Sequence, residues 1–440
     1  MRIQKINIGI LSGEEISIDL LGDFSINKSN EKITGKCIVN FERNVVKLKC
    51  NNKIYTKEKD FLLTPSYYET EMFRLNNVKI GMDFHWEQQK NLMYQGSLKF
   101  VINEEELTAI NIINIDDYLR SVISSEMSPK NSVEFLKAHA IVSRSWLISQ
   151  LLNKGKTQME FTNNSDEHIV WHDKNDHNLF DVCADDHCQR YQGISKIRNE
   201  NVDKAIKLTK GLVLTFDKKV LDARYSKCCG GKTELFENVW EPTPSTGLQS
   251  IFDYKYPPDE YERNLTDEKC ARRWFLDRPK SFCDTDDENL LDNILVDFDK
   301  KTQNFFRWQI IYSQKDIAAL INKNLGMDFG RILDLQPIKR GESGRLIKLK
   351  IIGEKKTLTI GKELEIRRVL SEKHLYSSAF FVEKEDIKNN VPQKFILNGA
   401  GWGHGVGLCQ IGAAVMAGQN YRFDEILLHY FPQAKIEKAY

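Results

Sequence analysis

Hydrophobic and polar positions alternate through the first 110 residues of the chain. Short runs such as "KCIVNF", "VVKLKC" and "GSLKFVI" place every second side chain on an apolar face, and Asn, Gly and Lys residues separate the runs. A period of two is typical of strands that bury one face. We therefore predict a β-rich N-terminal region over residues 1–110.

The spacing of the apolar residues changes at Ile115. From there they recur every three or four positions, Asn114 or Asp116 can cap the first turn, and Pro129 ends the pattern. A longer helical pattern, "VEFLKAHAIVSRSWLISQLLNKG", ends at Gly155, where a C-terminal cap is expected. Together the two segments predict a helical hairpin.

The rest of the chain mixes strand and helix patterns. Strands are predicted in "GLVLTF", "RLIKLKIIG" and "KKTLTIG", and helices in "SQKDIAALINKNLG" and "FDEILLHYF". We predict an α+β fold in which the helical hairpin packs on a mixed or antiparallel sheet. Its expected parts are the β-rich region 1–110, a core with the hairpin at 111–240, an inserted α/β lobe at 241–385, and a Gly-rich loop and helix at 386–440 that complete the core.

Composition narrows the classes of partner. The 440 residues include 63 Lys and Arg against 62 Asp and Glu, so charge gives no argument for nucleic acid or an anionic membrane. No apolar run approaches the ~18 residues that span a bilayer, and the start "MRIQKINIGI" contains no visible signal peptide. The nine cysteines do not resemble a small disulfide scaffold. We expect a soluble chain, either cytoplasmic or processed from a form with a leader.

One carboxylate in the predicted hairpin has an unusual position. Glu126, in "DDYLRSVISSEMSPK", falls on or beside the apolar face and in the last turn of its helix. Partial burial and the negative end of the helix dipole both disfavour the charged form, so we expect a raised pKa. A carboxyl group that stays protonated near neutral pH can act as a general acid. The alternative is a glutamate at the edge of the face, with its head group in water.

The segment "DHNLFDVCADDHCQRYQG" contains two imidazoles and two thiols that together span twelve residues. Thiolates and neutral imidazoles are ligands that Zn²⁺ favours, and four protein ligands would make a closed, structural site. The alternatives are a disulfide within the segment or surface histidines with unpaired thiols, and His168 and His172 are further candidates. The predicted ligands are His177, Cys183, His187 and Cys188.

Two glycine-containing segments suggest close approach of a ligand to the backbone. In "ARYSKCCGGKTELFENVW", Gly230 and Gly231 mark a tight turn or a close contact, and the adjacent cysteines are interpreted as structural. The segment "NGAGWGHGVGLCQIGAAVMA" has neither GxxxxGK[ST] nor GxGxxG, which disfavours a nucleotide. Its Trp402 and His404 offer a stacking face and a neutral hydrogen-bonding group, which suit a sugar or amide.

Taken together, these segments resemble the SpoIID/LytB family, which comprises stage II sporulation protein D and the amidase enhancers. The hairpin "YLRSVISSEMSPKNSVEFLKAHAIVSRSW" is similar to the family pattern YLxxVxxxEMPxxxxxEALKAQAVAARTY. "YSKCCGGKTELFENVW" is similar to Y-x-S-x-x-G-G-x-T-E, and "GWGHGVGLCQIGAAVMAGQNYRFDEILLHYFP" to GHGVGxSQxGAxxMA…Y…ILxHYYP. "RGESGRLIKLKIIG" and "EIRRVL" also fit, so the resemblance covers roughly residues 100–440.

The resemblance implies a function in the cell envelope. The sporulation members are lytic transglycosylases that cut peptidoglycan glycan strands, and their catalytic acid and base corresponds to Glu126. The family also has a zinc held by His and Cys in the region of the predicted ligands, so we expect one structural Zn²⁺. Because glycine-rich loops let a glycan approach closely, we expect the substrate groove to be lined by Tyr225, Ser226, Gly230, Gly231, Trp402, His404 and Gln410.

Some residues depart from the family pattern, and the family contains a second function. Ser128 precedes Pro129 where the family has proline directly after the Met, and His139, Trp146 and Cys409 also differ. The amidase enhancers give the alternative, a module that binds peptidoglycan or activates a partner N-acetylmuramoyl-L-alanine amidase without turnover. A zinc-dependent amidase is less favoured because four protein ligands fill the coordination sphere. No nucleic acid or nucleotide is expected.

Overall fold

The computed structural model describes residues 5–82, 87–103, 105–154, 161–171, 177–195, 199–258, 261, 264–296, 299–301 and 304–440. The chain divides into two compact units. The first contains Met1–Arg144, Asp176–Leu212 and Lys438–Tyr440, and the second contains Ser145–Asn175 and Val213–Glu437. Helices and strands both occur in quantity, in mixed sheets, which confirms the predicted α+β class. The predicted division into four parts stays a prediction.

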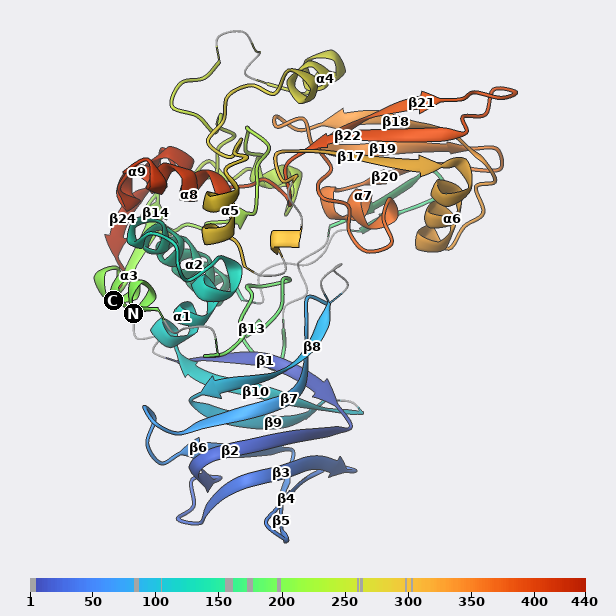
Figure 1. Ribbon diagram of the computed structural model, residues 1–440. Coiled ribbons are helices and arrows are strands. Elements are labelled where there is room, and N and C mark those ends of the chain that lie inside the picture. The colour runs from blue at the N-terminus through green and yellow to red at the C-terminus, as the bar shows by residue number, and fades with distance from the viewer. Residues whose placement is uncertain are drawn as a thin grey trace. The chain divides into compact units, whose positions relative to one another are not determined.

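The first unit is built on a large sheet whose strands run in the order β13-β1-β10-β9-β6-β2-β3-β4-β5, with β7 paired to β2 and β8 (Figure 1). Alternate burial along β2, where Ile16, Ile18 and Leu20 face inward, confirms the predicted period of two. A disulfide joins Cys37 and Cys50, which face each other across β3 and β4. The strands are β1 (Lys5–Gly13), β2 (Glu15–Ile26), β3 (Lys32–Glu42), β4 (Val45–Cys50), β5 (Lys53–Glu58), β6 (Asp60–Pro65), β7 (Met72–Ile80), β8 (Gln88–Gln95), β9 (Ser97–Asn103), β10 (Glu106–Asn114) and β13 (Val182–Cys183).

The predicted helical hairpin is present. Helix α1 (Ile115–Glu126) follows β10 directly, and Asn114 occupies its N-cap with an extended backbone. Helix α2 (Val133–Asn153) follows after the turn at Pro129, and the expected cap Gly155 lies outside the described residues. Helix α3 (Glu200–Leu208) packs against α1. Since α1 starts where β10 ends, and β10 is paired with β1 and β9 on its two sides, the position of α1 is fixed by the sheet.

The second unit contains several small sheets. A five-stranded sheet has the order β11-β12-β20-β19-β18, and a three-stranded sheet has the order β17-β22-β21. Strand β14 pairs with β15 and β24, and β16 pairs with β23. The strands are β11 (Phe161–Asn163), β12 (Glu167–Val170), β14 (Leu212–Phe216), β15 (Lys219–Val220), β16 (Tyr225–Ser226), β17 (Arg307–Ser313), β18 (Ile332–Arg340), β19 (Leu346–Gly353), β20 (Thr357–Gly361), β21 (Phe380–Glu385), β22 (Lys394–Ala400), β23 (Leu408–Cys409) and β24 (Lys435–Lys438).

Helices α6 and α7 lie together on one side of the strands from β17 to β22 (Figure 1). A shared core includes Ile317 and Ile321 of α6, Ile366 of α7 and Leu349 of β19. The strands predicted in "GLVLTF", "RLIKLKIIG" and "KKTLTIG" and the helices predicted in "SQKDIAALINKNLG" and "FDEILLHYF" are confirmed. The helices of this unit are α4 (Glu268–Asp277), α5 (Glu288–Ile294), α6 (Gln314–Leu325), α7 (Glu363–Val369), α8 (Gln410–Gly418) and α9 (Phe423–Tyr430), with the 3₁₀ turns Phe236–Asn238 and Asp299–Lys301.

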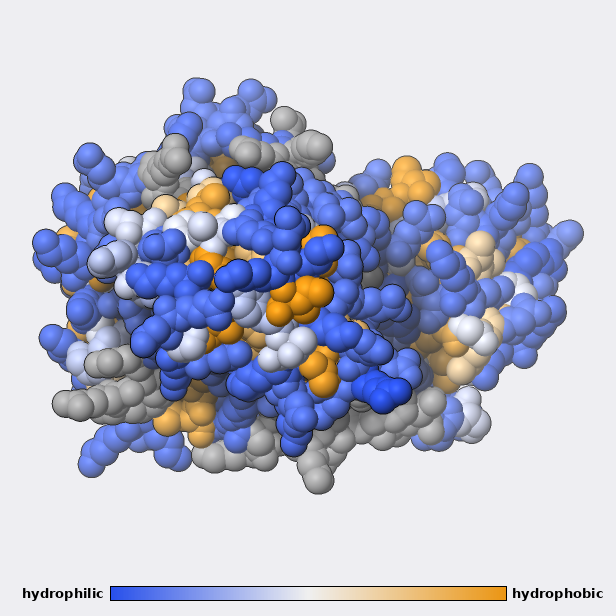
Figure 2. All heavy atoms as spheres, turned by 90° about the horizontal axis from the view of Figure 1, so that it is seen from below, coloured by the Kyte–Doolittle hydropathy of each residue, from blue (hydrophilic) through white to orange (hydrophobic). Residues whose placement is uncertain are grey.

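The surface carries hydrophobic side chains only in small groups over the face drawn in Figure 2, which is mostly hydrophilic. Among the described residues, no helix combines the length and the apolar character that crossing a membrane requires.

Candidate functional site

Glu126 is the last residue of α1, as its sequence position predicts. The backbone turns extended at Met127, so the helix ends before Pro129. Glu126 lies eleven residues after Ile115, which returns it to the buried face of the helix, and it is only 7% exposed. A carboxylate is thereby held away from bulk water at the helix end where the dipole is negative.

Arg190 holds this carboxylate in place. Its backbone N–H donates a hydrogen bond to Glu126 Oε1 over 3.0 Å, and its guanidinium Nε lies 3.9 Å from Glu126 Oε2. The same Nε donates to Asp186 Oδ1, so one cation lies beside two carboxyl groups. Burial raises the pKa of Asp186 to about 7. The negative charge of Glu126 also raises this pKa, whereas the positive charge of Arg190 lowers it. The roles of Asp186 and Arg190 were not predicted from the sequence. The one signal that points to them is their position as charged residues among the cysteines and histidines of "CADDHCQR".

The segment that carries Arg190 is anchored in the interior of the first unit. Tyr118 of α1 donates a hydrogen bond to Gln189 Oε1 over 3.1 Å, and its ring stacks on Tyr191 with 5.3 Å between centroids. The Tyr191 hydroxyl donates to Asn111 Oδ1 of β10 over 2.6 Å. These buried contacts fix the segment against α1 on both sides of Arg190, and thereby fix the hydrogen bond to Glu126.

The four predicted zinc ligands, His177, Cys183, His187 and Cys188, are brought together directly before this segment. Their ligand atoms all lie within 4.8 Å of one another. Cys188 Sγ is 3.4 Å from His177 Nε2 and 3.5 Å from His187 Nδ1. Zinc bonds of ~2.3 Å to sulfur and ~2.0 Å to nitrogen in a tetrahedron separate a sulfur and a nitrogen ligand by about 3.5 Å. The spacing and the donor types therefore fit one zinc ion, and its presence stays a prediction.

Electrostatics support metal binding at these four residues, which we call the Cys/His site. A hydrogen bond from Cys188, followed by hydrogen bonds from His177 and His187, lowers the pKa of Cys183 to about 2 despite its burial. The thiolate is the form that binds zinc. His168 belongs to the second unit, where its Nε2 lies 3.2 Å from Glu365 Oε1, and His172 lies outside the described residues.

The residues predicted to bind substrate belong to the second unit, and two of their segments lie side by side. Strand β16 pairs in parallel with β23, which places Ser226 opposite Cys409, and Cys228 bridges to Trp402. Ser226 is 6% exposed, and its hydroxyl has no hydrogen-bond partner among the described residues. An unpaired buried hydroxyl is costly, so Ser226 is the strongest candidate of this group for contact with a ligand. The prediction that these residues line one groove with Glu126 stays a prediction.

His404 has the neutral form that its predicted role requires. Burial, followed by the charges of three arginines, holds the pKa of His404 well below its usual range. Its Nδ1 accepts a hydrogen bond from the Val406 N–H over 3.0 Å, so the proton is on Nε2. The Trp240 ring meets His404 edge to face at 5.1 Å. The imidazole also makes a backbone hydrogen bond with Tyr225, so contacts within the protein fix its neutral tautomer.

The other predicted substrate residues are packed against the protein itself. Rings of Phe305 and Tyr376 lie 4.9 and 4.6 Å from the Trp402 ring. Gly230 has φ of +79°, and a Cβ there would lie 2.9 Å from the Gly401 nitrogen, so the close backbone approach occurs within the chain. Gly231 has φ of +102° and likewise faces protein atoms, while Tyr225 lies in β16 and Gln410 is buried at the start of α8. Substrate binding by these residues stays a prediction.

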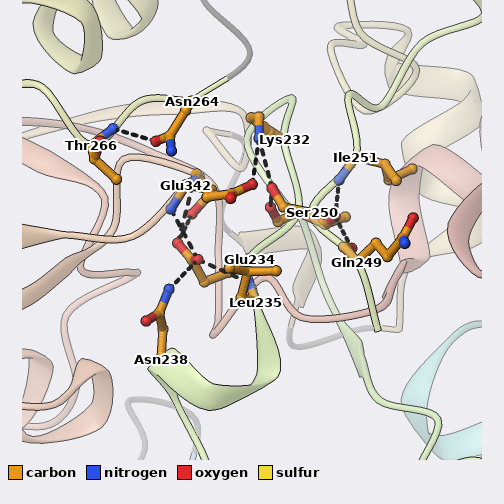
Figure 3. Close-up of polar contacts among 12 residues, drawn as sticks. Lys232, Glu234, Leu235, Asn238, Gln249, Ser250, Ile251, Asn264, Thr266 and Glu342 are labelled. Carbon is orange, nitrogen blue, oxygen red and sulfur yellow. Dashed lines mark hydrogen bonds and ion pairs between the residues drawn. The ribbon is translucent and has the colours of Figure 1, made fainter. Parts of the chain in front are cut away.

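The Thr-Glu pair that follows the two glycines has a structural role. Glu234 is 1% exposed, and its carboxylate accepts hydrogen bonds from the backbone N–H groups of Leu235 and Glu342 (Figure 3). The backbone N–H of Ser343 donates a further hydrogen bond to it. The Asn238 side chain and the Ser343 hydroxyl also donate to it. Glu234 therefore ties the segment after β16 to the turn between β18 and β19.

Comparison with known proteins extends the similarity over most of the chain. A family model described as Stage II sporulation protein matches residues 103–216, and one described as a Domain of unknown function (DUF8618) matches residues 234–407. An uncharacterized protein of Brachyspira hyodysenteriae is 26% identical over 339 residues, which are 77% of this chain and 70% of that protein.

Two relatives have descriptive names. The amidase enhancer of Bacillus subtilis is 25% identical over 325 residues, or 71% of this chain and 39% of that protein. Stage II sporulation protein D of Bacillus amyloliquefaciens is 21% identical over 332 residues, or 75% of this chain and 76% of that protein. The sporulation model spans both α1 with Glu126 and the Cys/His site, and the named relatives reach across both units; this similarity supports assignment of the chain to the SpoIID/LytB family.

Proposed function

We propose that the protein is a lytic transglycosylase that cleaves the β-1,4 bond between N-acetylmuramic acid and N-acetylglucosamine in peptidoglycan glycan strands. The observation that carries the proposal is the position of Glu126, buried at the end of α1 and held by Arg190. Membership of the SpoIID/LytB family supports a cell-wall role and a location in the cell envelope.

One carboxyl group is sufficient for this reaction. Most glycosidases need two, one to protonate the leaving oxygen and one to act as nucleophile or to activate water. In a lytic transglycosylase, the 6-hydroxyl of the substrate's own N-acetylmuramic acid attacks the anomeric carbon as the glycosidic bond breaks. Glu126 donates a proton to the departing oxygen and then removes one from the attacking hydroxyl. The products are a 1,6-anhydro end and a free 4-hydroxyl, and Glu126 returns to its starting state.

Arg190 and Asp186 act as positioning residues in this scheme. The Arg190 N–H fixes the orientation of the Glu126 carboxyl group, and Asp186 in turn fixes the Arg190 guanidinium. Because its side chain is hydrogen-bonded to Arg190, Asp186 helps to orient Glu126 and does not attack the sugar. Holding a catalytic group in the reactive orientation before the reaction lowers the entropic part of the activation barrier.

His177, Cys183, His187 and Cys188 would hold a zinc ion at the start of the same segment. Four protein ligands complete a tetrahedral shell, and the bound ion would supply a structural cross-link. The chain's own contribution is to hold Arg190, two residues after Cys188, against the end of α1.

Similarity to the amidase enhancer supports a second candidate function. In that case the protein binds peptidoglycan or activates a partner N-acetylmuramoyl-L-alanine amidase, and Glu126 has no catalytic role. The two functions differ in the products that the purified protein releases.

The test is mass analysis of the fragments released from purified sacculi and from glycan strands freed of stem peptides. Wild-type protein should release fragments with anhydro ends. Glu126→Gln keeps the size of the side chain but removes the transferable proton, so cleavage should fall by at least ~10²–10⁴-fold. Glu134→Gln is the matched control, since Glu134 lies in the first turn of α2 with a side chain 35% exposed.

Other outcomes identify other functions. Hydrated reducing ends would indicate a hydrolase. The absence of fragments, together with faster cleavage by an added amidase, would favour the enhancer. A folded Glu126→Gln protein that still forms anhydro ends at nearly the wild-type rate would refute the role of Glu126.

A further inference from the structure

A second group of metal-binding side chains converges in the second unit. The ligand atoms of Cys229, Asp253, Cys283 and Cys409 all lie within 4.8 Å of one another. None of the four residues is more than 2% exposed. They come from four separate parts of the sequence, so the fold alone brings them together.

The distances are those of ligands around an ion. Cys229 Sγ lies 3.6 Å from Cys283 Sγ and 3.4 Å from Asp253 Oδ2. In a tetrahedron with bonds of ~2.3 Å to sulfur and ~2.0 Å to oxygen, two sulfurs are about 3.8 Å apart and a sulfur and an oxygen about 3.5 Å. A disulfide would bring the sulfurs to about 2.05 Å. The spacing of the cluster matches coordination rather than a disulfide.

The surroundings orient Asp253 toward the three thiols. The Tyr430 hydroxyl donates a hydrogen bond to Oδ1 over 2.6 Å, and the Cys283 N–H donates to Oδ2 over 3.1 Å. His429 Nε2 lies 3.8 Å from Oδ1. Metal-binding carboxylates are usually hydrogen-bonded in this way, with one side held by the protein and the other turned to the ion.

We propose that Cys229, Asp253, Cys283 and Cys409 bind a second zinc ion. Three sulfurs and one oxygen are a ligand set that zinc accepts, and four protein ligands leave no open position, so the ion is structural. Zinc binding at these residues does not depend on the transglycosylase function proposed above.

The ion would hold the two glycine-containing segments together. Cys229 directly precedes Gly230 and Gly231, and Cys409 directly precedes Gln410. Strands β16 and β23 share only the two register pairs at Ser226 and Tyr225. A metal ion joining Cys229 to Cys409 would strengthen this short contact beneath the residues predicted to bind substrate.

Zinc analysis of the purified full-length protein tests the proposal. The wild type should contain two zinc ions per chain, and Cys283→Ser and Cys183→Ser should each remove one, because each change removes one thiolate from a different site. Cys270→Ser is the matched control, since Cys270 lies on α4 outside both clusters, and it should keep both ions.

X-ray absorption of the wild type decides the question even if a variant does not fold. Two occupied sites should give on average about two and a half sulfur ligands per zinc, at ~2.3 Å. One zinc per chain with two sulfur and two nitrogen ligands would overturn the proposal. A mass lower by two hydrogens, mapped to a Cys229–Cys283 disulfide, would also overturn it.

Discussion

Replacing Glu234 by glutamine tests whether the Thr-Glu pair of the family pattern holds the fold or contacts the substrate. Oε1 of Glu234 accepts three hydrogen bonds and Oε2 accepts two, all from groups of the second unit. A glutamine amide has one oxygen and one NH₂ group. In either orientation, the NH₂ group faces donors that had been paired with a carboxylate oxygen.

The expected cost is large because the site is buried. A hydrogen bond to a charged group contributes about 1.5–3 kcal/mol, and a buried donor left unpaired costs ~1–3 kcal/mol. These terms overlap, so we expect Glu234→Gln to lower the free energy of unfolding by about 3–5 kcal/mol, as for other buried networks that lose one partner. For a unit of this size, that corresponds to a fall in Tm of roughly 10 °C.

Glu385→Gln is the matched control. Its side chain is 50% exposed and that of its partner Lys394 is 39% exposed, so losing this 3.1 Å ion pair should cost ~1 kcal/mol or less. Urea unfolding followed by tryptophan fluorescence measures the difference, since six of the seven tryptophans belong to the second unit. Equal stabilities of the two variants would refute the structural role. Loss of activity by Glu234→Gln at unchanged stability would instead place Glu234 in contact with the substrate.

Three further changes test other parts of the second unit. Gly230→Ala should lower Tm by more than Gly326→Ala in calorimetry, because both glycines have positive φ but a Cβ at position 326 meets no atom within 4 Å. Arg345→Lys should cost several times more stability than Arg331→Lys, since the buried Arg345 guanidinium donates to the Cys229 and Gly403 carbonyls and Arg331 is 56% exposed. Burial, followed by Lys339 and Lys348, lowers the pKa of Lys362 to about 7, so the unfolded chain holds one more proton between pH 7 and ~10. Wild-type stability relative to Lys362→Met should therefore rise with pH over that range in urea titrations, and a flat difference would contradict the lowered pKa.

Local signals were enough to predict the hairpin. Asn114 and Pro129 lie next to the two ends of α1 in the sequence and mark where the helix begins and ends. The position of Glu126 relative to Ile115 depends only on the helical period. The proximity of His177, Cys183, His187 and Cys188 was also predictable, because all four lie within twelve residues. Helices α4 and α5 were not predicted, although Asp267 and Asp287 cap their first turns. These helices are short and lie in a charged stretch where periodicity is weak.

Contacts between distant segments could not be predicted from the sequence. Strand β6 lies between β9 and β2, an order that no local pattern encodes. Arg190 reaches Glu126 only because the intervening chain turns back, and a hydrogen bond across 64 residues leaves no periodic signal. Cys283 and Asp253 looked like isolated residues until the fold placed them beside Cys229.

The hydrogen bond from Arg190 to Glu126 limits how this chain can change during evolution. Arg190 follows Cys188 by two residues. A substitution that disrupts the Cys/His site would therefore also loosen the Arg190 N–H group that orients Glu126. A descendant that lost one of these four side chains would need a compensating change in the same segment to keep Glu126 in place. Any selection on the position of Glu126 would therefore act on the Cys/His site as well.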